Sequence, residues 1–187
     1  MEFKQVAIPD CKLFVPKVFE DSRGYFYEGF NRKKFFEHTG IDFNIVQINQ
    51  SKSSKGVLRG LHFQLPPFDQ AKLVSVIEGE VLDVAVDLRK DSDYYGKYVS
   101  VILSEDNKQH FFIPRGFAHG FLVKSSTAKF MYGVDNVYSP AHDSGIRFDD
   151  EDIRIDWEFP LNEILVSEKD NNLAHLKDFN SPFEIIH

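Results

Sequence analysis

The sequence predicts an all-β fold of the jelly-roll type with a few short peripheral helices. Short runs in which apolar and polar residues alternate, separated by turn residues, dominate the chain and are typical of a sandwich or barrel. The 19 Phe and 7 Tyr residues fit packed sheets better than helices. No internal repeat, low-complexity tract or linker divides the sequence, so we expect one domain over residues 1–187.

In chain order, the alternating runs predict strands at residues 24–30, 45–50, 56–64, 72–88, 98–103, 110–113, 121–123 and 129–138. Gly79 indicates a turn or bulge that divides the long run into two strands. The period of two in residues 81–88 predicts one buried face, with Asp83 and Asp87 on the other. We expect these carboxylates and Arg89 to form structural pairs rather than to act in catalysis.

One helix is predicted near the N-terminus. Asn31 is a suitable N-cap, Phe35 and Phe36 supply an apolar side, and Gly40 supplies a left-handed stop. Shorter helical pieces are expected at residues 149–153 and 169–176.

Composition excludes several classes of partner. The formal net charge of −7 disfavours nucleic acid and anionic lipid, although an anionic ligand fits if Arg and Lys gather in one cleft. Cys11 is the single cysteine, which excludes an intramolecular disulfide and any Cys-based metal site. The charged N-terminal residues and the lack of a long apolar run give no sign of a signal peptide or membrane span. We therefore expect a cytoplasmic protein with no membrane partner.

A first candidate site lies in the strand at 56–64. Alternation along this strand places Arg59 and His62 on opposite faces. A lone strand His is more often structural than catalytic, but Gln47, Asn49 and Lys72 add unusual polarity to the neighbouring strands. Buried polar groups cost about 1–3 kcal/mol each unless they are paired. Such a patch inside a small barrel predicts a ligand cavity.

A second candidate follows the turn at residues 114–116, where His119 opens the next expected strand. The spacing Pro-x-Gly-x-x-His resembles the second motif of the cupin superfamily, whose members often bind a metal. Metal-binding cupins carry a His-x-His pair in their first motif, whereas His62 is followed two residues later by Gln64. A stable divalent site usually needs three or four protein ligands. We therefore expect no metal.

Six sequence runs then occur in a recognisable order. They are residues 21–26 (DSRGYF), 56–62 (GVLRGLH), 72–74 (KLV), 86–89 (VDLR), 113–121 (IPRGFAHGF) and 167–170 (SEKD). Together they resemble the dTDP-4-dehydrorhamnose 3,5-epimerase family, which acts in dTDP-L-rhamnose synthesis, over residues 3–176.

The resemblance implies a jelly-roll homodimer that needs no metal or organic cofactor. It would epimerise dTDP-4-dehydro-6-deoxy-D-glucose at C3 and C5 to dTDP-4-dehydro-L-rhamnose. In this reading His62 accepts a proton, Asp170 holds its other ring nitrogen, Tyr132 donates from the opposite side, and Lys72 lies by the C4 ketone oxygen. The positions that match nucleotide-sugar contacts are Arg23, Glu28, Gln47, Asn49, Arg59, His119, Asp143 and Lys169, with Phe26 and Tyr138 flanking the thymine.

The chemistry explains these residue types. A carbon acid beside a ketone is weak, so the developing enolate needs a fixed positive charge or donor, for which Lys72 and His119 are candidates. Inversion needs a second group on the opposite face, and a neutral phenol such as that of Tyr132 suits it, although by sequence alone Tyr132 belongs to an aromatic core strand. Three alternatives stay open: an epimerase of one centre or a ketoisomerase, a metal-dependent cupin oxygenase, and a non-catalytic sugar-nucleotide-binding module.

Overall fold

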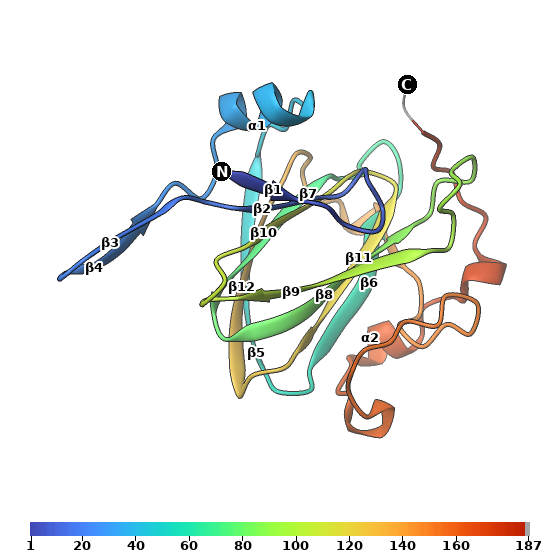
Figure 1. Ribbon diagram of the computed structural model, residues 1–187. Coiled ribbons are helices and arrows are strands. Elements are labelled where there is room, and N and C mark those ends of the chain that lie inside the picture. Colours follow the sequence, from blue (N-terminus) through green and yellow to red (C-terminus); the bar gives the residue numbers. More distant parts are fainter. Residues whose placement is uncertain (186–187) are drawn as a thin grey trace.

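The computed structural model describes residues 1–185, and this part of the chain forms three sheets and a few short helices (Figure 1). Two of the sheets make the body of the molecule as a β-sandwich, and the third is a two-stranded hairpin that extends from it. Neighbouring strands within each sheet are antiparallel. The predicted all-β jelly roll with short peripheral helices is confirmed.

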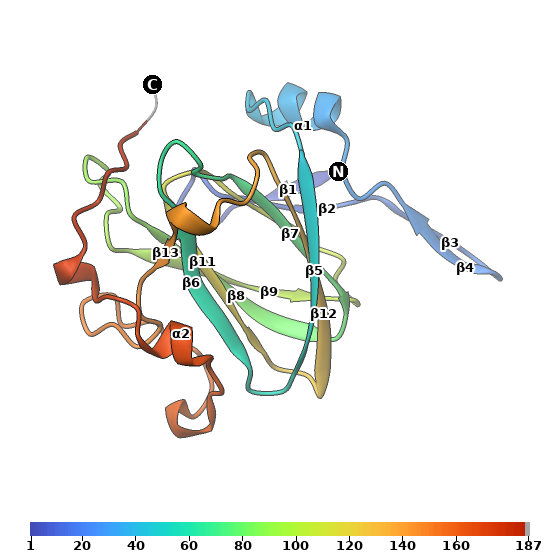
Figure 2. The same ribbon diagram turned by 180° about the vertical axis from the view of Figure 1, so that it is seen from behind.

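The larger sheet has the order β1 (Glu2–Lys4), β2 (Lys12–Val15), β10 (His110–Ile113), β7 (Lys72–Glu78), β12 (Thr127–Val134) and β5 (Gln47–Ser54). The second sheet has the order β13 (Asp143–Gly145), β6 (Leu58–Gln64), β11 (Phe117–Val123), β8 (Glu80–Asp87) and β9 (Tyr98–Ser104). The two sheets face each other across the core (Figure 2).

Apolar packing fills three layers of this sandwich. The central cluster joins side chains from both sheets, such as Val74 and Phe130 from one and Ala85 and Phe121 from the other. A second cluster covers the outer face of the five-stranded sheet with the C-terminal segment, where Trp157 is almost fully buried. A third lies between the larger sheet and the N-terminal helix.

The expectation that strand β8 has one buried and one polar face is wrong, because the C-terminal segment packs on the outer face of its sheet. Its predicted polar face is buried as well, because that face points into the sandwich while the apolar face packs under the C-terminal segment. Asp87 pairs with Arg89 at 2.5 Å, which confirms the expected structural pair. Gly79, with φ of 81°, ends β7 and starts β8 as predicted.

The helix α1 (Arg32–Thr39) has the predicted caps. The Asn31 side chain accepts a hydrogen bond from the Lys34 amide at 3.1 Å, and Gly40 adopts a left-handed φ of 72°. The expected helix at 149–153 is wrong, because Asp150 there caps a turn by accepting backbone bonds. The expected helix at 169–176 is replaced by α2 (Glu168–Asn171) and a 3₁₀ turn at Leu176–Asp178; further 3₁₀ turns cover Pro140–His142 and Leu161–Glu163.

Several strand boundaries also differ from prediction. Strand β11 begins at Phe117, so His119 lies inside it rather than opening it. Strand β12 ends at Val134, which leaves Tyr138 on a connecting segment. The segment 24–30 is strand only as β4 (Gly24–Tyr27), which pairs with β3 (Val18–Asp21) in the projecting hairpin. Within the described residues, every helix is too short or too polar for a lipid bilayer crossing.

Candidate active site

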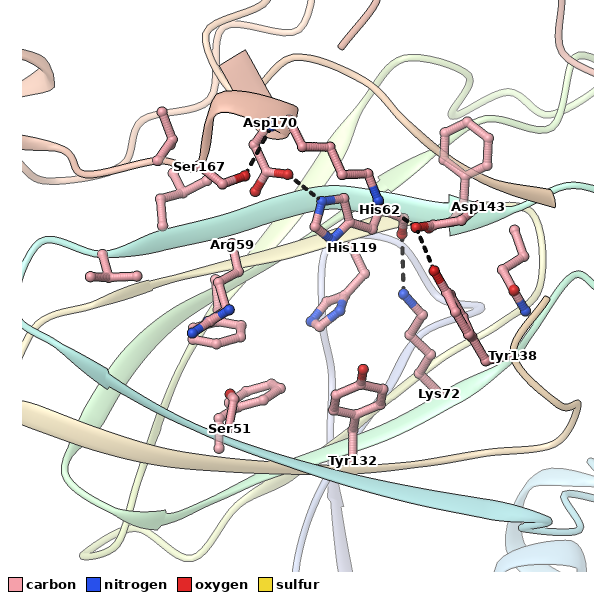
Figure 3. Close-up of a pocket in the computed structure, with 18 of the residues that line it drawn as sticks. Ser51, Arg59, His62, Lys72, His119, Tyr132, Tyr138, Asp143, Ser167 and Asp170 are labelled. Atoms are coloured by element: carbon pink, nitrogen blue, oxygen red, sulfur yellow. Dashed lines mark hydrogen bonds and ion pairs between the residues drawn. The ribbon is translucent and has the colours of Figure 1, made fainter. Parts of the chain in front are cut away.

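A cavity of about 620 Å³ opens between the two sheets, beside the C-terminal segment (Figure 3). Strands β5, β7 and β12 form one wall, and β6 and β11 form the other. Its polar and ionisable lining residues are Ser51, Arg59, His62, Gln64, Gln70, Lys72, His119, Tyr132, Tyr138, Asp143, Ser167, Lys169 and Asp170. The ligand cavity predicted from the polar strand residues is therefore present.

A histidine–aspartate pair lies on the β6 wall. Nε2 of His62 is 2.7 Å from Oδ1 of Asp170, which lies in α2 behind the strand. Asp170 is held in place because Oδ2 accepts from the Gly60 amide at 3.1 Å and its own amide donates to Ser167 Oγ at 3.0 Å. Burial opposes ionisation of Asp170, but the hydrogen bonds from His62 and Gly60 prevail and lower its pKa. A carboxylate on Nε2–H leaves Nδ1 of His62 as the basic nitrogen.

The predicted opposition of Arg59 and His62 is wrong, because both side chains line the cavity. The β6–β11 register pairs His62 with His119 and Arg59 with Phe121, so three steps along β6 match two along β11. This β-bulge adds one residue to β6 and cancels the simple alternation. Arg59 is fixed by a 3.0 Å hydrogen bond from Nε to Ser53 Oγ.

Lys72 and Tyr132 come from the opposite wall. Lys72 Nζ reaches across the cavity and donates to the His62 carbonyl at 3.1 Å. Burial lowers the pKa of Lys72 from 10.5 to about 8, while Asp83 and Asp143 favour the charged form. Burial raises the pKa of Tyr132, so its phenol stays protonated at neutral pH. In Figure 3 the Tyr132 hydroxyl points into the space below His62 and beside Lys72.

A second histidine–aspartate pair, which the sequence did not predict, supports the cavity floor. Nε2 of His119 lies 2.9 Å from Oδ2 of Asp83, and both side chains are buried. Burial lowers the pKa of His119 and raises that of Asp83, and each partner opposes the shift of the other. Asp83 was expected to pair with structural residues, but it faces a residue predicted to bind substrate. The alternating pattern had placed Asp83 on the polar face of its strand, so no sequence signal pointed to this contact.

Tyr138, Asp143 and Lys169 gather at the mouth of the cavity. The Tyr138 hydroxyl donates to Asp143 Oδ2 at 3.0 Å, and Lys169 forms an ion pair with the same carboxylate. These bonds raise the pKa of Lys169 and of Tyr138. The structure thus brings all three predicted residues together.

Gln47 and Asn49 lie on β5 beside the cavity rather than among its lining residues. Gln47 Nε2 donates to Asn49 Oδ1 at 2.9 Å, and Gln47 Oε1 accepts from the Tyr138 amide at 3.1 Å. Asn49 is the cross-strand partner of Tyr132. By strand alternation both residues lie on the same face of β5 as Ser51, which lines the cavity, so they connect to predicted site residues at its edge.

Three predicted binding residues are not brought to this cavity within one chain. Arg23 and Phe26 lie on the hairpin β3–β4, and Glu28 follows it (Figures 1 and 2). The hairpin extends away from the sandwich, and Phe26 is 70% exposed. Glu28 binds Lys34 of the neighbouring helix at 2.8 Å. In the described chain β3 and β4 pair only with each other, so no strand pairing holds the hairpin against the two sheets of the sandwich.

Within residues 1–185, no three His, Cys, Asp or Glu side chains gather as a potential metal-binding group. In the cavity, each of the two histidines already has a carboxylate partner on Nε2.

Comparisons with known proteins place the chain in a family. The family described as dTDP-4-dehydrorhamnose 3,5-epimerase matches residues 5–178. The enzyme of that name from Shigella flexneri is 51% identical over 92% of this chain and 94% of its own length. The crystal structure of the Elizabethkingia anophelis enzyme is 51% identical, with a TM-score of 0.92 over 95% of this chain and 97% of that one.

A further crystal structure comes from Legionella pneumophila and is described as dTDP-6-deoxy-D-glucose-3,5-epimerase in complex with dTDP-4-keto-L-rhamnose. It is 41% identical, with a TM-score of 0.95 over 100% of this chain and 99% of that one. Family match, identity and fold agree over nearly the whole length. The chain therefore belongs to the dTDP-4-dehydrorhamnose 3,5-epimerase family.

Proposed function

We propose that the protein epimerises dTDP-4-dehydro-6-deoxy-D-glucose at C3 and C5, giving dTDP-4-dehydro-L-rhamnose. The observation that carries this proposal is the placement of a His62–Asp170 pair and Tyr132 on facing walls of one cavity, with Lys72 between them. This arrangement supplies a base, an acid on the other side, and a cation for the charge that develops between the two steps.

His62 is the base. Its Nε2 is hydrogen-bonded to Asp170, so Nδ1 removes the proton from the carbon beside the ketone. The low pKa of Asp170 keeps its carboxylate charged, and this charge stabilises the imidazolium that forms. Removal of the proton leaves the electron pair on the C4 oxygen as an enolate.

Lys72 stabilises that enolate. Its ammonium group is held by the His62 carbonyl and is largely removed from water, where a charge acts more strongly than in bulk solvent. One preorganised donor of this kind typically contributes about 3–4 kcal/mol to a transition state.

Tyr132 returns a proton from the opposite face. Its raised pKa keeps the phenol neutral, so it can donate to the enolate carbon and regain a proton from solvent. Because the donor and the base belong to different sheets, the carbon is inverted without any need for the sugar to turn over. The same groups serve C3 and C5, which both neighbour the C4 ketone.

The nucleotide is proposed to bind along the rest of the cavity. Arg59 and Lys169 supply positive charge for the diphosphate, for which the guanidinium fork is well suited. His119 contacts the sugar, and Tyr138 stacks on the thymine beside Asp143. Gln47 and Asn49, on β5, are the remaining residues of this chain that we propose to bind the nucleotide sugar.

The hairpin β3–β4 supports a homodimer in which each chain completes the site of its partner. Arg23 and Phe26 carry the charge and the aromatic ring that a nucleotide needs, yet they lie far from the cavity of their own chain. An exposed aromatic hairpin is typical of a segment that packs on another subunit. We propose that Arg23, Phe26 and Glu28 bind the substrate held by the partner.

Mixed dimers test this arrangement. Dimers of His62→Ala and dimers of Arg23→Ala should both be nearly inactive. Co-expressed together, the two should regain activity, because the Arg23→Ala pocket keeps its base and receives an intact hairpin. Co-expressed His62→Ala and Tyr132→Phe chains are the control, since neither pocket is then complete. Failure of the first mixture to regain activity would mean that each hairpin serves its own chain or none.

The function itself is tested by proton exchange in heavy water. The purified, chelator-treated protein is incubated with dTDP-4-dehydro-6-deoxy-D-glucose and the sugar is followed by NMR. Deuterium at both C3 and C5 with an L-configured product is the expected result. Exchange at one carbon would indicate a single-centre epimerase, and no exchange would indicate a binding module. His62→Ala should abolish exchange, whereas Tyr132→Phe should preserve exchange and impair inversion.

We also propose that residues 1–187 form one domain, that the reaction needs no metal or organic cofactor, and that the protein works in the cytoplasm without nucleic acid or membrane partners. The shared core of the two sheets supports the first of these statements.

A further inference from the structure

Gln64, the last residue of β6, is bound to both neighbours of Tyr138. Its Oε1 accepts from the Ser139 amide at 2.6 Å, and its Nε2 donates to the Val137 carbonyl at 3.2 Å. The same Nε2 donates to the Phe68 carbonyl at 2.8 Å. The side-chain amide therefore bonds the 137–139 backbone as a neighbouring strand would, and it joins that segment to the loop after β6.

Tyr138 has few other restraints. It lies beyond the end of β12, it belongs to none of the apolar clusters, and its side chain is 51% exposed. Its hydroxyl bonds to Asp143 and its amide to Gln47, both at the cavity. Gln64 by contrast is only 4% exposed and sits on a paired strand. Gln47 holds the amide of Tyr138 itself, whereas Gln64 is the buried side chain that bonds to the backbone of both neighbours of Tyr138.

We infer that Gln64 is a positioning residue that sets the affinity of the protein for the nucleotide by fixing the backbone on both sides of Tyr138. This inference rests on the proposed function in one respect, the stacking of Tyr138 on the base. Because Gln64 already orders the Tyr138 ring in the free protein, the conformational entropy of ordering that ring is not lost when the nucleotide binds. Gln64 lies two positions after the catalytic base His62 on β6. One strand would therefore carry both the group that removes the proton and the group that positions the nucleotide.

The test variant is Gln64→Met, which keeps the length and volume of the side chain and removes its three hydrogen bonds. We expect KM for the dTDP-sugar and Kd for dTDP to rise about tenfold, and kcat to stay within about twofold. In a Tyr138→Ala background the same substitution should add less than a twofold change, because the residue acts through that ring. Additive losses, or a fall in kcat with an unchanged KM, would overturn the inference.

Gln70→Met is the matched control. It removes one 2.7 Å hydrogen bond to the Asn136 carbonyl in the same pair of loops, without touching the neighbours of Tyr138. An equal rise in KM for both variants would assign the effect to the loops in general and refute a specific role of Gln64. Gln64→Glu is the second variant: it keeps the acceptor for Ser139 but places a carboxylate against the Val137 and Phe68 carbonyls, so KM should rise at least as much as in Gln64→Met.

Amide hydrogen exchange gives a readout that does not depend on turnover. The Ser139 amide should exchange at least tenfold faster in Gln64→Met, while the Asp170 amide, capped by Ser167, keeps its wild-type rate. Unchanged protection of Ser139 would overturn the inference. If the wild type did not epimerise the sugar, the proposed function would fail, and the exchange and dTDP-binding measurements would still decide whether Gln64 holds this segment.

Discussion

Lys72 offers a direct test of the enolate mechanism through the pH dependence of the reaction. Burial lowers its pKa from 10.5 to about 8, which corresponds to about 3 kcal/mol of lost stabilisation of the ammonium form. Only the protonated form can donate to the enolate. The value of kcat/KM should therefore fall about tenfold per pH unit above pH 8. Tyr132 cannot cause this limb, because burial raises its pKa above the ordinary phenol value of 10.

Lys72→Arg is the informative substitution, because a guanidinium stays charged across this range. The variant should be slower at pH 7, since its fork does not fit the space of an ammonium, but its profile should stay flat up to about pH 10. The measurement is kcat/KM from pH 6 to 10 by NMR or a coupled assay. Lys169→Arg, at the mouth of the same cavity, should keep the limb near pH 8. A limb near pH 8 that persists in Lys72→Arg would refute the role assigned to this lysine.

Three further predictions follow from the buried polar groups. Asp83→Asn removes a carboxylate that favours the charged form of Lys72, so the alkaline limb of kcat/KM should move below pH 8 and an unmoved limb would contradict the proposed coupling. Asp170→Asn should lower kcat about a thousandfold while Kd for dTDP, measured by calorimetry, stays within about twofold. His110 is buried with Nε2 unpaired in the described chain, and burial lowers its pKa to about 4. Its folded form resists protonation that the unfolded chain accepts near pH 6.5, so stability should fall by about 3 kcal/mol from pH 6.5 to 4. Urea unfolding of His110→Phe should lack that part of the pH dependence, and equal slopes in both proteins would exclude the histidine as its source.

The local features of the fold were predictable from sequence because they depend on neighbouring residues. Asn31 and Gly40 bound the helix as expected, and Gly79 divides the long strand run, since each acts through its own backbone geometry. The existence of a polar cavity also followed from polar residues on core strands. The catalytic roles of the residues in that cavity were predicted only from the family resemblance. The local sequence of Tyr132, for example, is that of an aromatic core strand.

Other features could not be predicted because distant segments create them. The bulge that turns Arg59 toward His62 depends on how β6 pairs with β11, some 60 residues away in the chain. Asp83 meets His119 through a different pairing, that of β8 with β11, on a face that the alternating pattern predicted to be polar rather than buried. The alternation of apolar and polar residues predicts which face of a strand is buried only where the strand register is regular and the segments that cover each face are known.

The sandwich explains why an enzyme of this kind can invert a carbon that is already bound. A single sheet presents side chains to one face of a ligand, so a base on it can return a proton only to the side from which the proton came. Directly packed sheets lie about 10 Å apart with side chains filling the gap, whereas the cavity of about 620 Å³ between these two sheets leaves room for a sugar ring. His62 on β6 and Tyr132 on β12 use this spacing from opposite walls, and Lys72 crosses it to reach the carbonyl of His62. The separation of acid from base is thus a consequence of the two-layer fold, and a substitution that closed the layers together would be expected to impair inversion before it impaired proton removal.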